Sequence, residues 1–453
     1  MQYDFSKIES NYGIKLDDTQ RSVLFDLISF IEGKEHEICL TASAGTGKTM
    51  LLNILYDILN NCGYDVCFVT PTNKSKAVIV GNSSKDALTI HSLLNLRPNI
   101  DIMDYDATQL QFDFGMLNRS KIQVRDILLV DECSMINDDI YEVLEKYFGR
   151  SKIIYSGDPK QLAPVNQQHM SKTFSCRQLH LTKIYRQPES KIYQVLEYLR
   201  KKPIYKFKPV NDDNGNIIIC NNIINMIETY APIFKVASNF NETQLVKLVT
   251  YTNNRIQALN DLIRKKLYDD NEEYHEREVL TTYDRVVFKP NHVLLENSKD
   301  YMIKYVSSTT MYLANIVFKG YELTLTDGDF DYVVKILSKD NKKEDFEKLA
   351  CELETRRQRA VDKKQINLWK NFFDLEQGFL TPIDLIYDNR VIKRKSIDYG
   401  YCISTHKAQS SGYTTVMIDM ENIWRCKNPE ELRQLQYVAC SRTKKDLIIY
   451  QRD

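Results

Sequence analysis

A loop of small residues separates an apolar run, Ile38-Cys39-Leu40, from a helical pattern that begins at Met50. Its sequence is Ala42-Ser43-Ala44-Gly45-Thr46-Gly47-Lys48-Thr49. Small residues between a strand and a helix allow backbone N–H groups to surround a phosphate, and the helix N-terminus adds partial positive charge. Lys48 would neutralise the β- and γ-phosphate oxygens, and Thr49 would offer a hydroxyl to Mg²⁺. The loop therefore predicts a nucleotide site that includes Gly45, Thr46, Gly47, Lys48 and Thr49.

Two adjacent carboxylates, Asp131 and Glu132, end the next strongly apolar strand, which starts at Ile127. One carboxylate can bind the Mg²⁺ that Thr49 contacts, and its neighbour can orient and deprotonate the attacking water. The alternative is a solvated strand end or a helix cap. We expect Asp131 to be the metal ligand and Glu132 to be the catalytic base.

Three further polar residues have side chains suited to phosphoryl transfer. Gln161, in Gly157-Asp158-Pro159-Lys160-Gln161, follows the next strand and could reach the γ-phosphate or its water, although the segment alone is also a simple turn. Arg186 and Arg442 could stabilise charge on the γ-phosphate oxygens from another domain. For Arg442, the alternative is an arginine that interacts with the dipole at a helix C-terminus.

Composition limits the class of protein. With 453 residues, the chain is long enough for two to four domains, and 61 basic residues balance 61 acidic ones. A polyanion would therefore have to bind in a local groove. The ten cysteines form no C-x-x-C pair and predict reduced thiols in an intracellular protein. Because no apolar run reaches membrane-spanning length and no signal peptide is present, we expect a cytoplasmic protein without a membrane segment.

Strands and helices alternate in residues 36–80 and again in 127–156, a pattern typical of a parallel sheet. An amphipathic helix, Thr19 to Glu32, precedes them, with Asp17 or Asp18 as its N-cap. Between them, residues 97–125 contain the alternating Leu110-Gln111-Phe112-Asp113-Phe114, which predicts an inserted hairpin.

A second α/β pattern covers 187–268 and resumes at 399. Residues 269–397 interrupt it with alternating valines and tyrosines, which predict a small antiparallel β unit with turns at Gly320 and Gly328. The charged stretch 342–364, continuing to Phe373, predicts a helical projection. The fold class is therefore α/β.

Ten short segments, in order, resemble the motifs of superfamily 1 helicases, and in particular the RecD-like branch that includes the phage Dda helicase. Gln20 matches an upstream adenine-reading glutamine, residues 42–49 match the first motif, and Asp131-Glu132-Cys133-Ser134-Met135 resembles D-E-x-S-M. The other segments begin at Thr70, Thr89, Gly157, Leu181, Thr250, Ser404 (as Ser404-Thr405-His406-Lys407-Ala408-Gln409) and Tyr437 (as Tyr437-Val438-Ala439-Cys440-Ser441-Arg442).

The resemblance implies two RecA-like P-loop domains with parallel sheets and with ATP between them. The expected boundaries are 1–178 for the first domain, with a pin hairpin at about 97–125, then 179–268 and 398–453 for the second. Residues 269–397 would form an SH3-like β insertion in the second domain. The first domain would supply Lys48, Thr49, Asp131, Glu132 and Gln161, the second would supply Arg186 and Arg442, and Tyr185 would stack on adenine.

The resemblance also implies a track for single-stranded DNA over both domains. The expected contacts are Pro71, Thr72, Asn73, Lys74 and His91 on the first domain and Thr252, Asn253, His406 and Lys407 on the second. Phe112 or Phe114 is the candidate wedge of the pin, and the alternative is that both rings only pack the hairpin. The histidines have a structural alternative as well.

The expected activity is that of an ATP- and Mg²⁺-dependent DNA helicase that moves 5′ to 3′ and separates duplex DNA. Alternatives are a translocase or protein-displacing motor without unwinding, and an RNA helicase. The expected partners are single-stranded DNA, single-strand/duplex junctions, and replication or recombination proteins. We expect a monomer in the cytoplasm of a bacterium or a phage-infected host.

Overall fold

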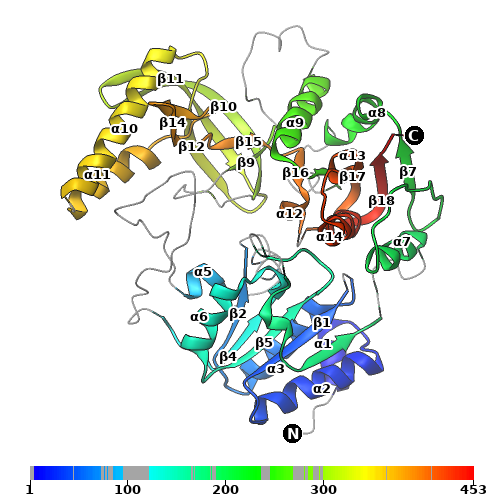
Figure 1. Cartoon of the computed structure of the whole chain (residues 1–453). Helices are drawn as coiled ribbons and strands as arrows, with labels where there is room; N and C mark the ends of the chain where they lie inside the picture. Colours follow the sequence, from blue (N-terminus) through cyan, green and yellow to red (C-terminus); the bar gives the residue numbers. More distant parts are fainter. Residues whose placement is uncertain are drawn as a thin grey trace.

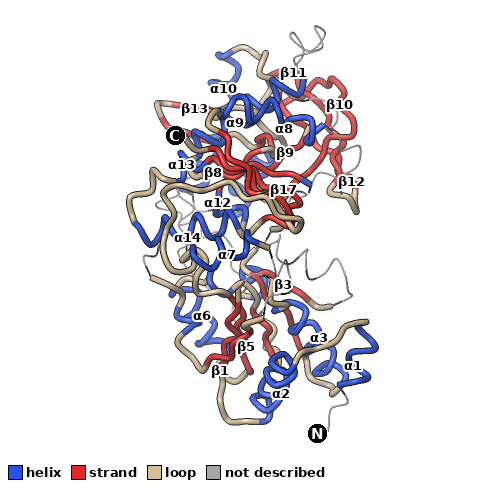
Figure 2. The backbone as a smooth tube through the Cα atoms, turned by 90° about the vertical axis from the view of Figure 1, so that its right-hand side faces the viewer, coloured by secondary structure: helices blue, strands red, loops and turns tan. Residues whose placement is uncertain are grey.

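The computed structural model describes residues 5–43, 45–72, 76, 79, 85–94, 122–164, 167, 169–183, 185, 190–235, 245–268, 280, 284–288, 295, 299–363, 365–409 and 411–452. Figure 1 shows three parts, each built around its own sheet. We call them the first α/β unit (blue to cyan-green), the second α/β unit (green, orange and red) and the β insertion (yellow and orange). Figure 2, turned by 90°, shows the two α/β units one above the other.

Among its described residues, the first α/β unit forms a six-stranded parallel sheet in the order β3-β2-β4-β5-β1-β6. The strands are β1 (Glu37–Ala42), β2 (Val66–Thr70), β3 (Ala87–Thr89), β4 (Ile127–Val130), β5 (Lys152–Gly157) and β6 (Gln178–Leu181). The helices are α1 (Phe5–Tyr12), α2 (Asp18–Glu32), α3 (Lys48–Asn61), α5 (Ile90–Leu93) and α6 (Asp138–Phe148), with short 3₁₀ helices η2 (Cys133–Met135) and η3 (Lys172–Phe174).

Helices cover both faces of this sheet because its strands are apolar on both faces. On β1, Ile38 and Leu40 pack toward α2 and α3, whereas Cys39 packs with the core beneath α5 and α6. The predicted N-cap of α2 is confirmed at Asp17, whose side chain accepts a hydrogen bond from the Gln20 backbone in a capping box.

The second α/β unit is also a parallel sheet, with the order β16-β8-β17-β18-β7. Its strands are β7 (Ile217–Cys220), β8 (Val246–Thr250), β16 (Cys402–Ser404), β17 (Tyr413–Asp419) and β18 (Thr443–Tyr450). Helices α7 (Lys191–Leu199) and α14 (Pro429–Cys440) pack on one face, and α8 (Ile223–Lys235) and α9 (Asn253–Tyr268) pack on the other. Two short helices, α12 (Thr405–Ala408) and α13 (Met420–Ile423), complete the unit.

The β insertion is antiparallel, with the order β12-β11-β10-β9-β15. Its elements are β9 (Arg285–Phe288), β10 (Asp300–Leu313), β11 (Ile316–Thr326), β12 (Asp331–Leu337) and β15 (Ile397–Tyr399), with the hairpin β13 (Leu385–Tyr387) and β14 (Arg390–Lys393). The charged segment forms α10 (Lys343–Lys363) and α11 (Ile366–Gln377), and both pack against the far end of the β10–β11 hairpin.

One of the two predicted turns is wrong. Gly320 lies inside β11, paired with Thr309 and Leu337. A Cβ atom there would lie 2.7 Å from the Ile336 carbonyl oxygen, so packing rather than a turn requires glycine. The actual turn between β10 and β11 is Ala314-Asn315, with φ of 51° and 63°, whereas Gly328, with φ of 99°, does lie in a turn.

Two predicted domain boundaries cut through strands. Residue 178 begins β6, which pairs with β1, so the first sheet extends to Leu181. The boundary at 397/398 falls within β15, which pairs with β9 of the β insertion. The sequence alone missed both because a short edge strand carries no distinct apolar run.

The predicted pin hairpin, including Phe112 and Phe114, lies outside the described residues and stays a prediction. Among the helices of the described part of the chain, none is long and apolar enough to cross a membrane.

Candidate functional site

The phosphate-binding loop joins the carboxyl end of β1 to α3. Gly45 and Gly47 have φ of 84° and 85°, a backbone conformation that favours glycine, and Gly47 is the N-cap of α3. A Cβ atom on Gly47 would lie 3.2 Å from Gln20 Nε2, which is a second reason for glycine there. The Lys48 ammonium lies inside the loop and donates to the carbonyl oxygens of Ala42, at 2.7 Å, and Ser43, at 3.2 Å.

Thr49 and Asp131 meet as the sequence predicted. The Thr49 hydroxyl donates to Asp131 Oδ2 at 3.0 Å, and Asp131 Oδ1 accepts from the Glu132 backbone N–H at 2.9 Å. A hydroxyl beside a buried carboxylate gives the oxygen ligands that Mg²⁺ prefers, so these residues fit the predicted metal. Glu132 has φ of 54°, a conformation that costs a non-glycine residue free energy and is frequent at active sites.

Gln20 and Tyr185 lie at the outer side of the same loop. The Tyr185 backbone N–H donates to the Gly45 carbonyl oxygen at 2.9 Å, and its hydroxyl donates to the Asp17 carboxylate. Burial and this hydrogen bond raise the pKa of Tyr185 to about 12. Burial opposes ionisation of Asp17, but the hydrogen bonds from Tyr185 and Gln20 prevail and lower the pKa of its carboxyl. Both residues predicted to contact adenine therefore border the phosphate-binding loop.

Gln161 links the two α/β units. Its Oε1 accepts a hydrogen bond from Nε2 of Gln409 at 2.9 Å, and the same Nε2 lies 3.2 Å from the Ser134 hydroxyl. Gln409 directly follows α12 of the second unit, whereas Gln161 and Ser134 belong to the first. Gln409 ends one of the helicase-like segments of the sequence but is not among the predicted site residues. Only the tertiary structure reveals that it lies between the two α/β units.

Of the two predicted arginines, the structure describes Arg442 and not Arg186. Arg442 is buried just after α14, where its Nε donates to the Val438 carbonyl oxygen at 3.0 Å and Nη2 donates to the Ser441 hydroxyl at 2.7 Å. These are the helix C-terminal interactions of the alternative interpretation. Arg186 lies outside the described residues, so a role for either arginine in hydrolysis stays a prediction.

The residues predicted to contact DNA follow the carboxyl ends of neighbouring strands. Pro71 and Thr72 follow β2, and His91 lies in α5 after β3, which pairs with β2. In the second unit, Thr252 and Asn253 follow β8, and His406 and Lys407 lie in α12 after β16, which pairs with β8. Each unit thus gathers its group at one edge of its sheet. Asn73 and Lys74 lie outside the described residues.

Contacts with neighbouring elements position residues of these groups. The Thr252 backbone N–H and the Thr250 and Thr252 hydroxyls donate to Asn422 Oδ1 at 2.9–3.2 Å. The His406 ring stacks on Tyr251 with 6.5 Å between ring centroids. Burial lowers the pKa of both His91 and His406, so each ring is uncharged near neutral pH.

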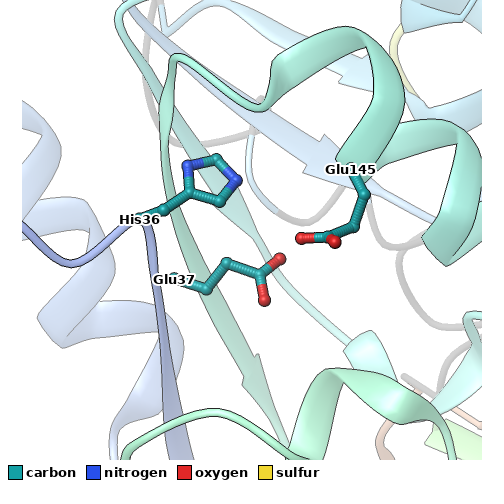
Figure 3. A group of neighbouring side chains, drawn as sticks. All are labelled: His36, Glu37 and Glu145. Atoms are coloured by element: carbon teal, nitrogen blue, oxygen red, sulfur yellow. The ribbon is translucent and has the colours of Figure 1, made fainter.

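A separate group of titratable residues, His36, Glu37 and Glu145, lies at the opposite end of β1 from the phosphate-binding loop. Figure 3 shows the His36 ring and the two carboxylates facing one another, and one ligand atom from each lies within 4.8 Å of the others. The Tyr155 and Tyr141 hydroxyls donate to Glu37 at 2.9 and 3.0 Å, yet burial still raises the pKa of this carboxyl. This group is distinct from the predicted Mg²⁺ site.

The fold and the site define a class of P-loop proteins. The chain contains two units, each built around a parallel sheet, and Gln161, predicted to act at the nucleotide in the first unit, contacts the second unit. Comparison with known families agrees. Residues 15–219 match the model of an AAA domain, and residues 399–450 match that of the UvrD-like helicase C-terminal domain.

Individual relatives extend over most of the chain. The ATP-dependent DNA helicase Dda of Enterobacteria phage T4 is 24% identical over 80% of this chain and 86% of its own length. The uncharacterised protein R530 of Acanthamoeba polyphaga mimivirus is 24% identical over 93% of this chain and 97% of its own. A crystal structure of the Pif1 helicase from Candida albicans shares the fold, with a TM-score of 0.52, 16% identity and coverage of 97% of this chain and 95% of that one.

The chain is therefore similar to superfamily 1 helicases, Dda among them, as its ordered motifs predicted.

Proposed function

We propose that the protein is an ATP-dependent DNA helicase that moves along single-stranded DNA from 5′ to 3′ and separates duplex DNA. The observation that carries the proposal is the hydrogen bond between Gln161 and Gln409, because it joins the nucleotide site of one α/β unit to the other unit. The similarity to Dda, whose name states an ATP-dependent DNA helicase, supports the choice of activity and polymer.

Each site residue has a proposed role. Lys48 and the N–H groups of Gly45 to Thr49 bind the phosphates, and Gln20 and Tyr185 bind adenine. Bound through Thr49 and Asp131, Mg²⁺ would supply charge neutralisation at the phosphates. Glu132 accepts the proton of the attacking water, Gln161 orients that water, and Arg186 and Arg442 stabilise the charge of the transition state.

Alternating closure of the two units converts this chemistry into movement. In the closed state, the DNA-binding group of each unit holds the strand. Hydrolysis then reopens the gap between the two units. Hydroxyl, amide and backbone contacts to phosphates hold DNA without reading its sequence. We propose the pin hairpin at about 97–125 as the strand separator, single-stranded DNA and junctions as the partners, and a monomer as the working form.

Lys48→Ala is the first test. Removing the ammonium leaves the β- and γ-phosphates without their cation, so we expect DNA-stimulated ATP hydrolysis to be abolished while the melting temperature is kept. Lys146→Ala, a change at an exposed lysine of α6, is the control and should hydrolyse ATP normally. Turnover in Lys48→Ala at the wild-type rate would exclude the proposed site.

Polarity and polymer need a separate assay. A DNA strand with a central single-stranded segment and two flanking duplexes reports direction, because 5′-to-3′ movement displaces the oligonucleotide paired at the 3′ side. ATP hydrolysis without displacement of either oligonucleotide would favour a translocase or protein-displacing motor. Stronger stimulation by RNA than by DNA would favour an RNA helicase.

The wedge is tested by Phe112→Ala and Phe114→Ala. An aromatic ring at the pin would part the base pairs, so we expect at least one variant to unwind poorly while hydrolysing ATP at the wild-type rate. Phe25→Ala is the matched control, since Phe25 is 57% exposed on α2. Normal unwinding by both pin variants would place the wedge elsewhere.

A further inference from the structure

The turn after β5 is attached to the second α/β unit through Asp158. This carboxylate is completely buried, and its Oδ1 accepts from the Lys160 backbone N–H at 3.0 Å. Oδ2 accepts from Arg200 Nη1 at 2.9 Å and from the Tyr437 hydroxyl at 2.7 Å. Arg200 follows α7 and Tyr437 lies in α14, so one carboxylate of the first unit is held by two elements of the second.

Arg200 supplies the positive charge of this cluster. Its side chain is 19% exposed, it donates to the Tyr437 hydroxyl at 2.8 Å, and its guanidinium carbon lies 5.4 Å from the centre of the Tyr437 ring. A completely buried carboxylate needs a charged or hydrogen-bonding partner because water cannot solvate it. Arg200 therefore supplies the countercharge that Asp158 needs at this buried position.

The same turn carries Gln161. The Gln161 backbone N–H donates to the Asp158 carbonyl oxygen at 3.1 Å, and Leu162 packs in the core beneath α7 and α14. Arg433 of α14 adds a hydrogen bond to the Lys160 carbonyl oxygen at 3.3 Å. The Gln161 side chain accepts a hydrogen bond from Gln409, whose amide nitrogen also contacts the Ser134 hydroxyl. Ser134 lies two residues after Glu132 in the chain.

We propose that Arg200 is a positioning residue for ATP hydrolysis, an inference that rests on the proposed function. In the part of the chain that the structure describes, the Arg200 guanidinium contacts Asp158 and Tyr437 and not the phosphate-binding loop or the Thr49–Asp131 pair, so it acts through Asp158 on the turn that carries Gln161. It fixes this turn to the second unit, so that closure of the two units brings Gln161 to the attacking water in one defined orientation.

The test is steady-state ATP hydrolysis with saturating single-stranded DNA. We expect Arg200→Gln to lower kcat by about tenfold or more, because a small displacement of an orienting group slows the chemical step strongly. The KM for ATP should change by less than about twofold, because the groups that bind the phosphates and adenine are unaltered. Arg200→Lys keeps the charge and should recover part of kcat.

Arg264→Gln is the matched control. Arg264 pairs with Asp284 at 3.1 Å with the same exposures, 19% and 0%, and lies 4.9 Å from the Tyr399 ring, but it joins α9 to the β insertion. It should lower the melting temperature comparably and leave kcat unchanged. An equal loss of kcat in Arg264→Gln would show that the Arg200 effect comes from general destabilisation. That result would overturn the proposal.

A double-mutant cycle with Gln161→Ala tests the route. If Arg200 acts through Gln161, Arg200→Gln has little further effect on kcat once Gln161 is alanine. Additive effects, or a wild-type kcat in Arg200→Gln, overturn the positioning role while the proposed function stands. Absence of DNA-stimulated turnover in the unmodified chain would contradict the proposed function, and this inference would fall with it.

Discussion

At the scale of single residues, the nucleotide site combines close contacts with local strain. Thr49 lies in the first turn of α3, after β1, and Asp131 directly follows β4, yet they share a hydrogen bond of 3.0 Å because β1 and β4 are parallel strands of one sheet. Glu132 next to them adopts a left-handed backbone conformation, which costs about 1–2 kcal/mol for a residue other than glycine. Glu132 lies at the junction between β4 and the short helix η2, where the chain changes direction.

The lowered pKa of His406 predicts acid sensitivity. Burial lowers the pKa of this ring, so the unfolded chain takes up its proton at a higher pH than the folded chain does. The stabilising contribution is therefore complete above the unfolded pKa of about 6.5 and is lost as the pH falls below it. We expect His406→Gln, without DNA, to show a smaller fall in melting temperature than the wild type between about pH 7 and pH 5.

His169→Gln is the control for this measurement, because the His169 side chain is 64% exposed. It should not reduce the acid-induced fall. An identical fall in His406→Gln and the wild type would show that burial of His406 does not contribute to acid sensitivity.

At the scale of elements, both parallel sheets present polar residues at the carboxyl ends of their strands, where loops can approach a ligand. The phosphate-binding loop follows β1, which lies next to the edge strand β6, whereas Thr72 and His91 follow β2 and β3 at the opposite edge of the first sheet. One sheet end can therefore bind nucleotide and a nucleic-acid strand at separate places.

Tight turns set the shape of the β insertion. The β13–β14 hairpin turns at Asp388-Asn389, with φ of 49° and 59°, which is typical of a type I′ turn. Asn389 is exposed, so its substitution tests backbone conformation without changing packing. We expect Asn389→Val to lower the free energy of unfolding by about 1–2 kcal/mol, because a β-branched residue is strained at positive φ.

Asn389→Gly, measured by the same denaturant titration, should be as stable as the wild type or more stable, since glycine favours this conformation. Equal destabilisation by glycine and valine would contradict a backbone origin.

At the scale of the whole molecule, buried ion pairs join the β insertion to the second α/β unit. Lys247 of β8 is 1% exposed and donates to Asp300 of β10 at 2.9 Å and to the Gly400 carbonyl oxygen at 2.6 Å. Arg264 of α9 pairs with Asp284, which also accepts from the Tyr401 hydroxyl at 2.7 Å. Both carboxylates of this joint are buried, with side-chain exposures of 7% and 0%, so the two parts are expected to move together.

Breaking the joint should be costly. Lys247→Met leaves the Asp300 carboxylate buried without its cation, and we expect the free energy of unfolding to fall by about 3–5 kcal/mol. Lys247→Met combined with Asp300→Leu should recover much of this loss, because no charge is then left unpaired. Denaturant unfolding followed by circular dichroism measures both.

The exposed pair Lys304–Asp331 is the comparison, with side-chain exposures of 38% and 49%. Lys304→Met should lower the free energy of unfolding far less than Lys247→Met does, since water solvates the remaining carboxylate. Similar losses at both lysines would show that burial is not what makes the joint strong.

The sequence predicted the elements that have a clear apolar pattern. It missed the features that depend on which strands pair with one another. The apolar strands at Ile38–Leu40 and from Ile127 and the N-cap at Asp17 follow from local pattern and chemistry, and they agree with the structure. The turn wrongly placed at Gly320 and the strand split at residue 178 depend on which strands pair, information that no local window contains.

The sequence by itself determined the resemblance to superfamily 1 helicases, the α/β class and the residues of the phosphate-binding loop, because each depends on residue types at short spacing. Tertiary structure alone decided that Gln409 meets Gln161 and that Arg200 holds Asp158. The physical reason is that these contacts join residues far apart in the chain. Their distances are fixed only when two separately built sheets pack against each other.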